Sequence, residues 1–393
     1  MQISGAALAA GAAPSLVSLS SSLAAAAQAG SIPVPGEDGM IVRSFRFIDL
    51  ETPVEYFNTW LTPVPHFFVR NHMHEPSELS PDPASPDLAN SNWRLTVGGE
   101  VENPLTLTFS ALSKLETHSV VNTLECAGNG RSLHRPQVPG IQWGKGAVST
   151  ARFSGPRLRD ILQRASVKPT GKHVMFRGLD EVPGKVPPFI RSIPIEKALD
   201  SDTLVATHMN GAPLTKHHGS PARALVPGWI GAASCKWLTE IKILDSEFVG
   251  NFMSPGYRFP NQPVKPGDAV KPEDTHPLTA LNVKSVISGP LDGATLKPGK
   301  VSVRGAAWAG EADIVKVEVS TDGGASWNPA TLGHDHAHYA WRLWTHTWTA
   351  KAGDYTVLSR ATDSQGRTQP STPVWNPSGY LYNAADQVTI HVA

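Results

Sequence analysis

The sequence of 393 residues has only two cysteines, Cys126 and Cys235, and no excess of charge of either sign. Lysine plus arginine and aspartate plus glutamate each number 34, so the formal net charge is zero with neutral histidines. Proteins that bind nucleic acid or an anionic membrane usually carry a basic excess, because they must neutralise phosphates. The balance therefore argues against either as the main partner.

The sequence also lacks a long uninterrupted apolar run. Residues 1–36 carry no charged side chain, but serines and Pro14 interrupt their Ala/Leu stretch, which argues against the ~20 apolar residues of a membrane span. Ala27-Gln28-Ala29 has the small-x-small form of a signal cleavage site. We interpret residues 1–30 as the remnant of an export signal without its basic front end, which predicts a periplasmic protein. A disordered Ala/Ser tail is the alternative interpretation.

No Cys-x-x-Cys-His motif occurs, so we expect no c-type haem on this chain, and residues before about 40 show no pattern of a b-type haem domain. The two cysteines of an exported protein could form a disulfide, which keeps a non-catalytic secreted binding protein open as a function. In "ECAGNGR", however, Gly128 and Gly130 permit a sharp turn that returns Arg131 to the Cys126 sulfur. A guanidinium stabilises a thiolate, and a thiolate ligates soft metals.

Glycine and proline number 34 each, which is typical of a chain with many loops and short strands. Residues 40–275 mix apolar strand-like runs with short helical ones, as in "PRLRDILQRA", where Leu158, Ile161 and Leu162 recur at helical spacing. The segment 259–277 is rich in proline and charge, as expected of a domain boundary.

Beyond this segment the hydrophobic period changes to two. Val315, Val317 and Val319 alternate with polar residues, and Asp322-Gly323-Gly324 supplies a turn. A run of such short two-faced strands over residues 276–393 predicts an immunoglobulin-like β-sandwich. The fold class is therefore α+β, with a mixed α/β domain followed by a sandwich.

Two further stretches suit anions. In "HFFVRNHMHEP" Arg70 and His72 follow an apolar run; on a strand both side chains would leave the same face, offering a guanidinium fork and a ring donor. A glycine-rich bend at 216–237 gathers further cations and histidines: His217, His218, Arg223 and Lys236. Taken singly, each stretch has a plainer interpretation as a polar loop between strands.

Five stretches, in order along the chain, together resemble the sulfite oxidase family of molybdenum enzymes: "FFVRNH", "ECAGNGR", "GAVSTARFSGPRLRDIL", "HHGSPARALVPGWIGAASCKWL" and "YAWRLW". The resemblance covers roughly residues 45–393. It implies a sulfite-oxidase-type molybdopterin-binding catalytic domain at 40–275 and an immunoglobulin-like dimerisation domain at 276–393. It also implies one Mo-molybdopterin per chain and a homodimer.

The resemblance implies a role for individual residues. Cys126 takes the position of the molybdenum ligand. The positions that hold the pterin and its phosphate are Phe68, Val69, Arg70, Asn71, His72, Cys126, Asp180, His218, Arg223, Ser234, Cys235 and Lys236. The catalytic pocket for sulfite is formed by Arg70, Cys126, Arg131, Trp143, Tyr257 and Arg342. Tyr257 follows Trp237 by 20 residues, as in the family, although its flanking sequence "MSPGYRF" departs from the usual one.

The implied activity is oxidation of sulfite to sulfate by oxygen-atom transfer at a mononuclear molybdenum–pterin centre. Electrons would leave to an external acceptor, most simply a cytochrome c. A sulfane dehydrogenase of the same fold, acting on protein-bound sulfur, is the nearest alternative. A methionine-sulfoxide-type reductase lacks the sandwich, and a nitrate reductase is expected with haem and flavin domains. Three arginines in one pocket favour a small, free oxyanion.

Overall fold

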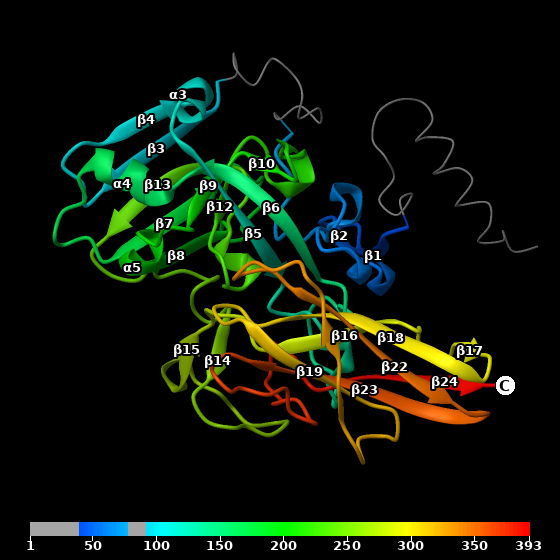
Figure 1. Cartoon of the computed structure of the whole chain (residues 1–393). Coiled ribbons are helices and arrows are strands. Elements are labelled where there is room, and N and C mark those ends of the chain that lie inside the picture. The colour runs from blue at the N-terminus through cyan, green and yellow to red at the C-terminus, as the bar shows by residue number, and fades with distance from the viewer. Residues whose placement is uncertain (1–38, 78–91) are drawn as a thin grey trace, which may run out of the picture.

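The computed structural model describes residues 39–77 and 92–393, so the predicted export-signal remnant at 1–30 lies outside the described residues. The described chain forms two packed units, a mixed one and a sandwich, which Figure 1 shows above and below one another. Strands predominate and helices are few and short, which confirms the α+β class. None of the helices in the described part is long and apolar enough to span a membrane.

The first unit is built on a five-stranded sheet. Its strand order is β4 (Leu105–Thr108), β3 (Arg94–Gly99), β13 (Leu238–Leu244), β7 (His173–Gly178) and β8 (Ile190–Pro194). Helix α4 (Leu158–Ala165) packs on this sheet through Leu158, Ile161 and Leu162, which are fully buried, as their helical spacing predicted. Burying each such side chain contributes about 1.5–3 kcal/mol, which holds the helix to the sheet.

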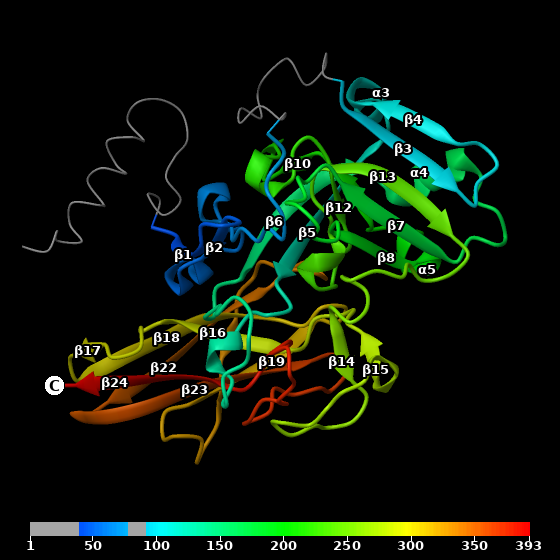
Figure 2. The same ribbon diagram turned by 180° about the vertical axis from the view of Figure 1, so that it is seen from behind.

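A second sheet carries the candidate site. Its order is β11 (Ala212–Pro213), β10 (His208–Met209), β6 (Val148–Pro156) and β5 (Thr117–Glu125). Strands β5 and β6 pair antiparallel along their whole length, from Thr117 opposite Pro156 to Glu125 opposite Val148. One end of β5 reaches the sandwich, as the view from behind shows (Figure 2).

Smaller elements complete this unit. Two-stranded ladders join β1 (Ile41–Ser44) to β2 (Asp49–Glu51), β9 (Leu204–Ala206) to β12 (Arg223–Leu225), and β14 (Arg258–Pro260) to β15 (Thr275–Pro277). The remaining helices are α3 (Phe109–Ser113), α5 (Ile195–Ala198) and the 3₁₀ turns η1 (Val54–Asn58), η2 (Val64–His66), η3 (Arg131–Leu133), η4 (Lys216–His218), η5 (Gly231–Ala233) and η6 (Pro272–Asp274). The segment 259–277, expected as a boundary, thus contains paired strands.

The second unit is the expected immunoglobulin-like sandwich. One sheet has the order β16 (Lys284–Gly289), β18 (Gly299–Trp308), β22 (Arg342–Ala350) and β21 (Thr331–Leu332). The other has the order β17 (Thr295–Leu296), β24 (Asp386–Val392), β23 (Gly353–Asp363), β19 (Ile314–Ser320) and β20 (Asn328–Pro329). Val303, Val317, Val357 and Ile390 interleave between the sheets as its core.

Two local sequence predictions were wrong. In β19, Val317 and Val319 are buried but Val315 is 55% exposed, because a bulge between Ile314 and Lys316 shifts the register and turns Val315 outward. Residues 67–72 do not form a strand. Only Val69 bridges to Leu50 there, so the common face expected for Arg70 and His72 does not arise from strand alternation.

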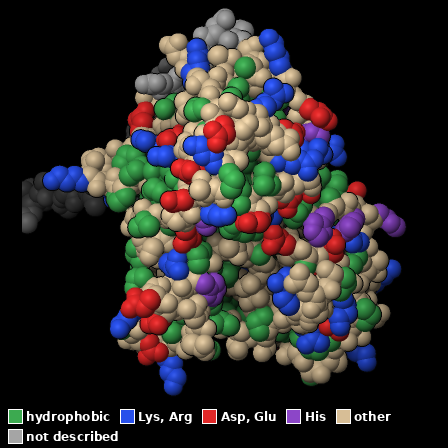
Figure 3. All heavy atoms as spheres, turned by 90° about the vertical axis from the view of Figure 1, so that its left-hand side faces the viewer, with side chains coloured by type: hydrophobic (Ala, Val, Ile, Leu, Met, Phe, Trp, Pro, Cys, Tyr) green, Lys and Arg blue, Asp and Glu red, His purple; other side chains and the backbone are tan. Residues whose placement is uncertain are grey.

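The two units meet directly at the end of β5. The Glu125 carboxylate accepts hydrogen bonds from Lys284 Nζ at 3.0 Å and from Trp308 Nε1 at 2.7 Å, both of the sandwich. The Thr123 backbone also donates to the Tyr339 carbonyl at 2.8 Å. The sandwich therefore fixes the strand that leads into Cys126. Elsewhere on the surface, acidic and basic side chains are interspersed over the face in Figure 3, in keeping with the balanced charge.

Candidate active site

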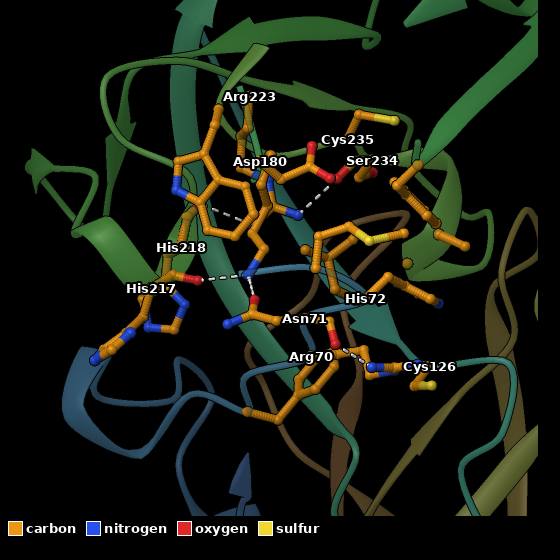
Figure 4. Close-up of a pocket in the computed structure, with 18 of the residues that line it drawn as sticks. Arg70, Asn71, His72, Cys126, Asp180, His217, His218, Arg223, Ser234 and Cys235 are labelled. Carbon is orange, nitrogen blue, oxygen red and sulfur yellow. Dashed lines mark hydrogen bonds between the residues drawn. The ribbon is translucent and has the colours of Figure 1, made fainter. Parts of the chain in front are cut away.

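A pocket between β5, the 67–73 segment and the glycine-rich bend gathers most of the predicted site residues (Figure 4). Its polar and thiol-bearing lining consists of Arg70, Asn71, His72, Cys126, Asp180, His217, His218, Arg223, Ser234, Cys235, Lys236 and Tyr257. Asp180 is the one carboxylate in the described lining, against three arginine or lysine side chains. The pocket is therefore positive in character.

Cys126 follows the last residue of β5 and begins a tight loop. Its N–H donates to the Ala147 carbonyl at 2.9 Å, and its carbonyl accepts from the Asn129 N–H at 2.8 Å. Gly130 has a φ of +89°, and a Cβ there would come within 2.9 Å of the Tyr382 side chain, so this position requires glycine. The loop thus holds the Cys126 thiol at the pocket wall.

Arg131 turns back under this loop, as predicted. Its Nε donates to the Ser378 carbonyl and its Nη1 to the Ile141 carbonyl, both at 2.9 Å, and a Cβ on Gly128 would meet its guanidinium at 2.5 Å. Burial raises the pKa of the Cys126 thiol, while Arg70 and Arg131 oppose that rise. In the chain alone burial outweighs the two guanidinium groups, so the predicted thiolate needs a bound cation to form.

Arg70 is anchored from below by Asp49. Its Nη1 lies 3.1 Å from Asp49 Oδ1, and the same guanidinium donates to the Asn71 carbonyl. Burial alone would lower the pKa of Arg70, but Asp49 raises it on balance, so the guanidinium stays charged in the pocket. Asp49 is 1% exposed, and burial raises its own pKa despite Arg70.

Tyr257 and His72 form a hydrogen-bonded pair in the pocket lining. The Tyr257 hydroxyl lies 2.5 Å from His72 Nε2. Burial, followed by the nearby cations Arg70 and Lys236, lowers the pKa of His72 well below its usual value, so the ring is neutral. Burial likewise raises the pKa of Tyr257, which keeps its proton. One proton is therefore shared between the phenol oxygen and the imidazole nitrogen.

The far end of the pocket is a cluster of cations around the glycine-rich bend. Arg223 donates to the carbonyls of His218 and Ser234, each at 3.0 Å, and its buried Nε has no partner among the described residues. Lys236 Nζ donates to the His217 carbonyl at 2.8 Å and to the Asn71 side chain. Burial lowers the pKa of Arg223 to about 10 and that of Lys236 to about 7. An anion between them would offset this desolvation.

Four predicted site residues are not part of the pocket lining: Val69, Arg131, Trp143 and Arg342. Val69 packs with Met40 and Leu50 instead of facing the pocket. Trp143 is fully buried in the hydrophobic cluster behind Phe68.

Arg342 lies in the sandwich, where its Nη2 donates to the Gly333 carbonyl at 2.8 Å. Placing Arg342 in the pocket was wrong for a physical reason. In β22 the residues alternate faces, so Arg342 shares the side of Trp344, which belongs to the sandwich core, while Trp341 faces the first unit.

The structure adds residues that the sequence did not single out. Glu75 accepts from His217 Nδ1 at 2.7 Å; burial acts to raise its pKa, but His217 and Lys236 lower it to about 2. Tyr380, from the sandwich, stacks on Tyr257 with ring centroids 5.4 Å apart. Arg191 covers the Tyr257 ring at 5.0 Å. Of Glu75, Tyr380 and Arg191, only Arg191 could have been noticed in the sequence, because it is the single charged residue in the mostly apolar run "PPFIRSIPI".

The two cysteines lie on opposite sides of the pocket and are both free (Figure 4). Cys235 directs its sulfur toward the Phe176 carbonyl at 3.9 Å within the core, and burial raises the pKa of its thiol to about 12. The disulfide alternative is therefore wrong. A thiol at one end and buried cations that form no ion pair with Asp180 at the other, with Arg223 Nε lacking a partner among the described residues, fit a soft metal carried by an anionic cofactor.

Comparison with known proteins defines the class first: a molybdopterin oxidoreductase. Residues 82–252 match the oxidoreductase molybdopterin binding domain, and residues 275–393 match the Mo-co oxidoreductase dimerisation domain. Over 368 residues the chain is 37% identical to sulfite oxidase of Gallus gallus, covering 89% of this chain and 77% of that protein. The chain belongs to the sulfite oxidase family, and its cofactor is Mo-molybdopterin.

A second relative and a solved structure show how much of each protein the similarity covers. Mitochondrial sulfite oxidase of Rattus norvegicus is 35% identical over 369 residues, which cover 89% of this chain and 65% of that protein. The chain thus spans somewhat less than two thirds of that relative's length. The solved structure of the sulfane dehydrogenase SoxCD from Paracoccus pantotrophus superposes with a TM-score of 0.77 at 26% identity, covering 93% of this chain and 94% of that one.

Proposed function

We propose that the protein oxidises sulfite to sulfate. Sulfite and water give sulfate, two protons and two electrons, and the bound molybdenum–pterin group supplies the oxygen-transfer and redox chemistry. The observation that carries the proposal is the positive pocket beside the Cys126 thiol, where Arg70 lines the wall and Arg131 underlies the loop. Charged donors held in a partly dehydrated site stabilise an oxyanion more strongly than they would in water.

Different residues of the chain would bind the metal, bind the cofactor, orient the substrate and transfer a proton. Cys126 would hold the metal, while Arg223, Lys236 and the buried neutral His218 would hold the anionic end of the cofactor. Arg70, fixed by Asp49, orients the substrate oxyanion. Tyr257, hydrogen-bonded to His72, holds a proton at its phenol oxygen next to the reacting group and can pass it to or from the neutral imidazole.

Electron transfer requires a partner, and we propose an external one such as cytochrome c. The absence of a Cys-x-x-Cys-His motif from the sequence supports this, since two electrons must leave after each turnover. We further propose a homodimer formed through the dimerisation domain at 275–393 and, from the composition of residues 1–30, a periplasmic location.

A second candidate function is oxidation of protein-bound sulfane sulfur, favoured by the likeness to SoxCD over nearly the whole of both chains. One assay separates the two. Molybdenum-replete protein is given either free sulfite or a protein persulfide, with an artificial one-electron acceptor. Saturable turnover of sulfite alone supports sulfite oxidation; turnover of the persulfide alone supports the second candidate.

A further inference from the structure

Arg191 is a buried cation directly behind the active-site tyrosine. It is the second residue of β8, between Ile190 and Ser192, and is 2% exposed. Its guanidinium carbon lies 5.0 Å from the centroid of the Tyr257 ring. One nitrogen donates to the Phe252 carbonyl, whereas the buried Nε has no partner among the described residues.

No carboxylate pairs with this charge in the part of the chain that the structure describes. Glu247 lies nearby and favours the charged form of Arg191, but its carboxylate is 3.8 Å from Arg258 and belongs to that pair. Arg191 and Glu247 both line a second cavity of about 290 Å³, which shares no lining residue with the cofactor pocket. An unpaired buried charge is costly to fold, so a purely structural role would be served better by an apolar side chain.

The rings of Tyr257 and Tyr380 lie between the Arg191 guanidinium and that of Arg131. Tyr257 stacks on Tyr380 with an interplanar angle of 11°, and Arg131 covers the Tyr380 ring at 5.4 Å as Arg191 covers Tyr257. Two guanidinium groups thus flank a pair of stacked tyrosines. The Tyr257 hydroxyl emerges from this cluster onto His72 in the pocket wall, and the charge of Arg191 is also felt at His72.

We propose that Arg191 is a positioning residue of the oxyanion pocket: it holds the Tyr257 ring in place and supplies a third guanidinium charge beside Arg70 and Arg131. The inference rests on the proposed function, because it assumes a small, doubly charged oxyanion such as sulfite or sulfate. Arg191 takes the place that the sequence had given to Arg342, whose guanidinium donates to the Gly333 carbonyl inside the sandwich. Arg191 acts without touching the substrate, since Tyr257 and Phe189 line the pocket in front of it.

The decisive variant is Arg191→Gln, which keeps a neutral N–H donor in the side chain and removes the charge. Arg191→Lys restores the charge, and Arg342→Gln removes an arginine of the sandwich that does not line the pocket. Each is prepared as molybdenum-replete enzyme. Sulfate binding to the resting enzyme is measured by calorimetry at low and high salt, and sulfite kinetics are measured separately.

For Arg191→Gln we expect a roughly tenfold weaker sulfate affinity at low salt and a similar rise in the sulfite KM, with kcat changed less. The difference from wild type should shrink at high salt, and Arg191→Lys should recover most of the affinity. Arg342→Gln should match wild type. An affinity within twofold of wild type for Arg191→Gln, with only a lower melting temperature, would reduce Arg191 to a structural role.

The two hypotheses fail in different ways. Wild-type enzyme that is molybdenum-replete but neither binds sulfate nor turns over sulfite overturns the proposed function, and the role of Arg191 with it. Normal wild-type turnover with an unaffected Arg191→Gln overturns the role of Arg191 alone. If Arg191→Gln does not fold, Arg191→Met and Arg191→Lys are compared, and equal sulfate affinities of these two variants would equally refute a charge effect.

Discussion

The hydroxyl of Tyr257 lies 2.5 Å from Nε2 of His72, although the two residues are 185 positions apart. The Tyr257 side chain is buried and that of His72 is half-buried at the pocket, and both are neutral because desolvation shifts their pKa values away from the charged forms. The pair is therefore a short, dry route for one proton. It also explains why the tyrosine that follows Trp237 by 20 residues is the one that reaches the site.

Tyr257→Phe removes the hydroxyl and leaves His72 Nε2 without its partner. We expect sulfite turnover to fall by about 10-fold for the lost hydrogen bond alone and by about 10²-fold or more for lost proton transfer. Stability should fall by only about 1 kcal/mol, the cost of one lost buried hydrogen bond. Steady-state kinetics over a range of pH, with a thermal melt as the folding control, check this. Unchanged turnover at every pH would remove Tyr257 from the reaction.

Cys126→Ser should abolish sulfite oxidation while the protein stays folded. Serine keeps the shape of the loop, but its hard hydroxyl oxygen replaces the soft sulfur ligand. Cys235→Ser is the matched control, because the Cys235 thiol points to the Phe176 carbonyl in the core, on the other side of the pocket from Cys126. Metal content and turnover are measured for both variants. Equal losses in the two would contradict the assignment of Cys126 alone to the metal.

Arg342→Met should leave sulfite kinetics within about twofold of wild type. The sequence had placed Arg342 in the substrate pocket, but its guanidinium donates to Gly333 within the sandwich. The substitution should therefore cost no more than about 1 kcal/mol of stability, from one hydrogen bond to a carbonyl. A rise of tenfold or more in the sulfite KM, with molybdenum content matched, would show that this arginine does reach the substrate.

His218 should make the protein acid-sensitive. Burial and then Lys236 lower its pKa to about 3, so the folded ring stays neutral while the unfolded one takes up a proton near pH 6.5. The unfolded state then binds more protons between these values, so stability falls as the pH drops from about 6.5 toward 3. His218→Gln should flatten this fall. Denaturant midpoints at several pH values test it, and parallel curves for the two proteins would contradict the assignment.

Much of the fold followed from local sequence patterns. The spacing of Leu158, Ile161 and Leu162 predicted α4, and alternation predicted the sandwich, because burial on one face imposes a period of 3.6 or 2. Where a β-bulge interrupts the strand, as beside Val315, strict alternation predicts the wrong face of the sheet for a side chain. Register irregularities depend on neighbouring strands, which a single strand's pattern does not reveal.

The site was predictable where chemistry and order along the chain coincide, as for Cys126, Arg223 and Lys236, which the pocket brings together. Arg342 shows the limit, because its motif fixed its strand but not which face the side chain leaves. Asp49 and Tyr380 show another limit. They come from segments distant in sequence whose contacts arise only from the packing of loops and of the two units.

The central claim is that sulfite is oxidised at a molybdenum site held by Cys126. Its most direct test is the rate of sulfite oxidation by the purified protein, with an artificial one-electron acceptor, expressed per bound molybdenum. We predict saturable turnover of about 1–10³ s⁻¹, the usual enzymatic range, with Cys126→Ser at the background rate. Stoichiometric molybdenum with no sulfite turnover, or turnover that persists in Cys126→Ser, would contradict the account.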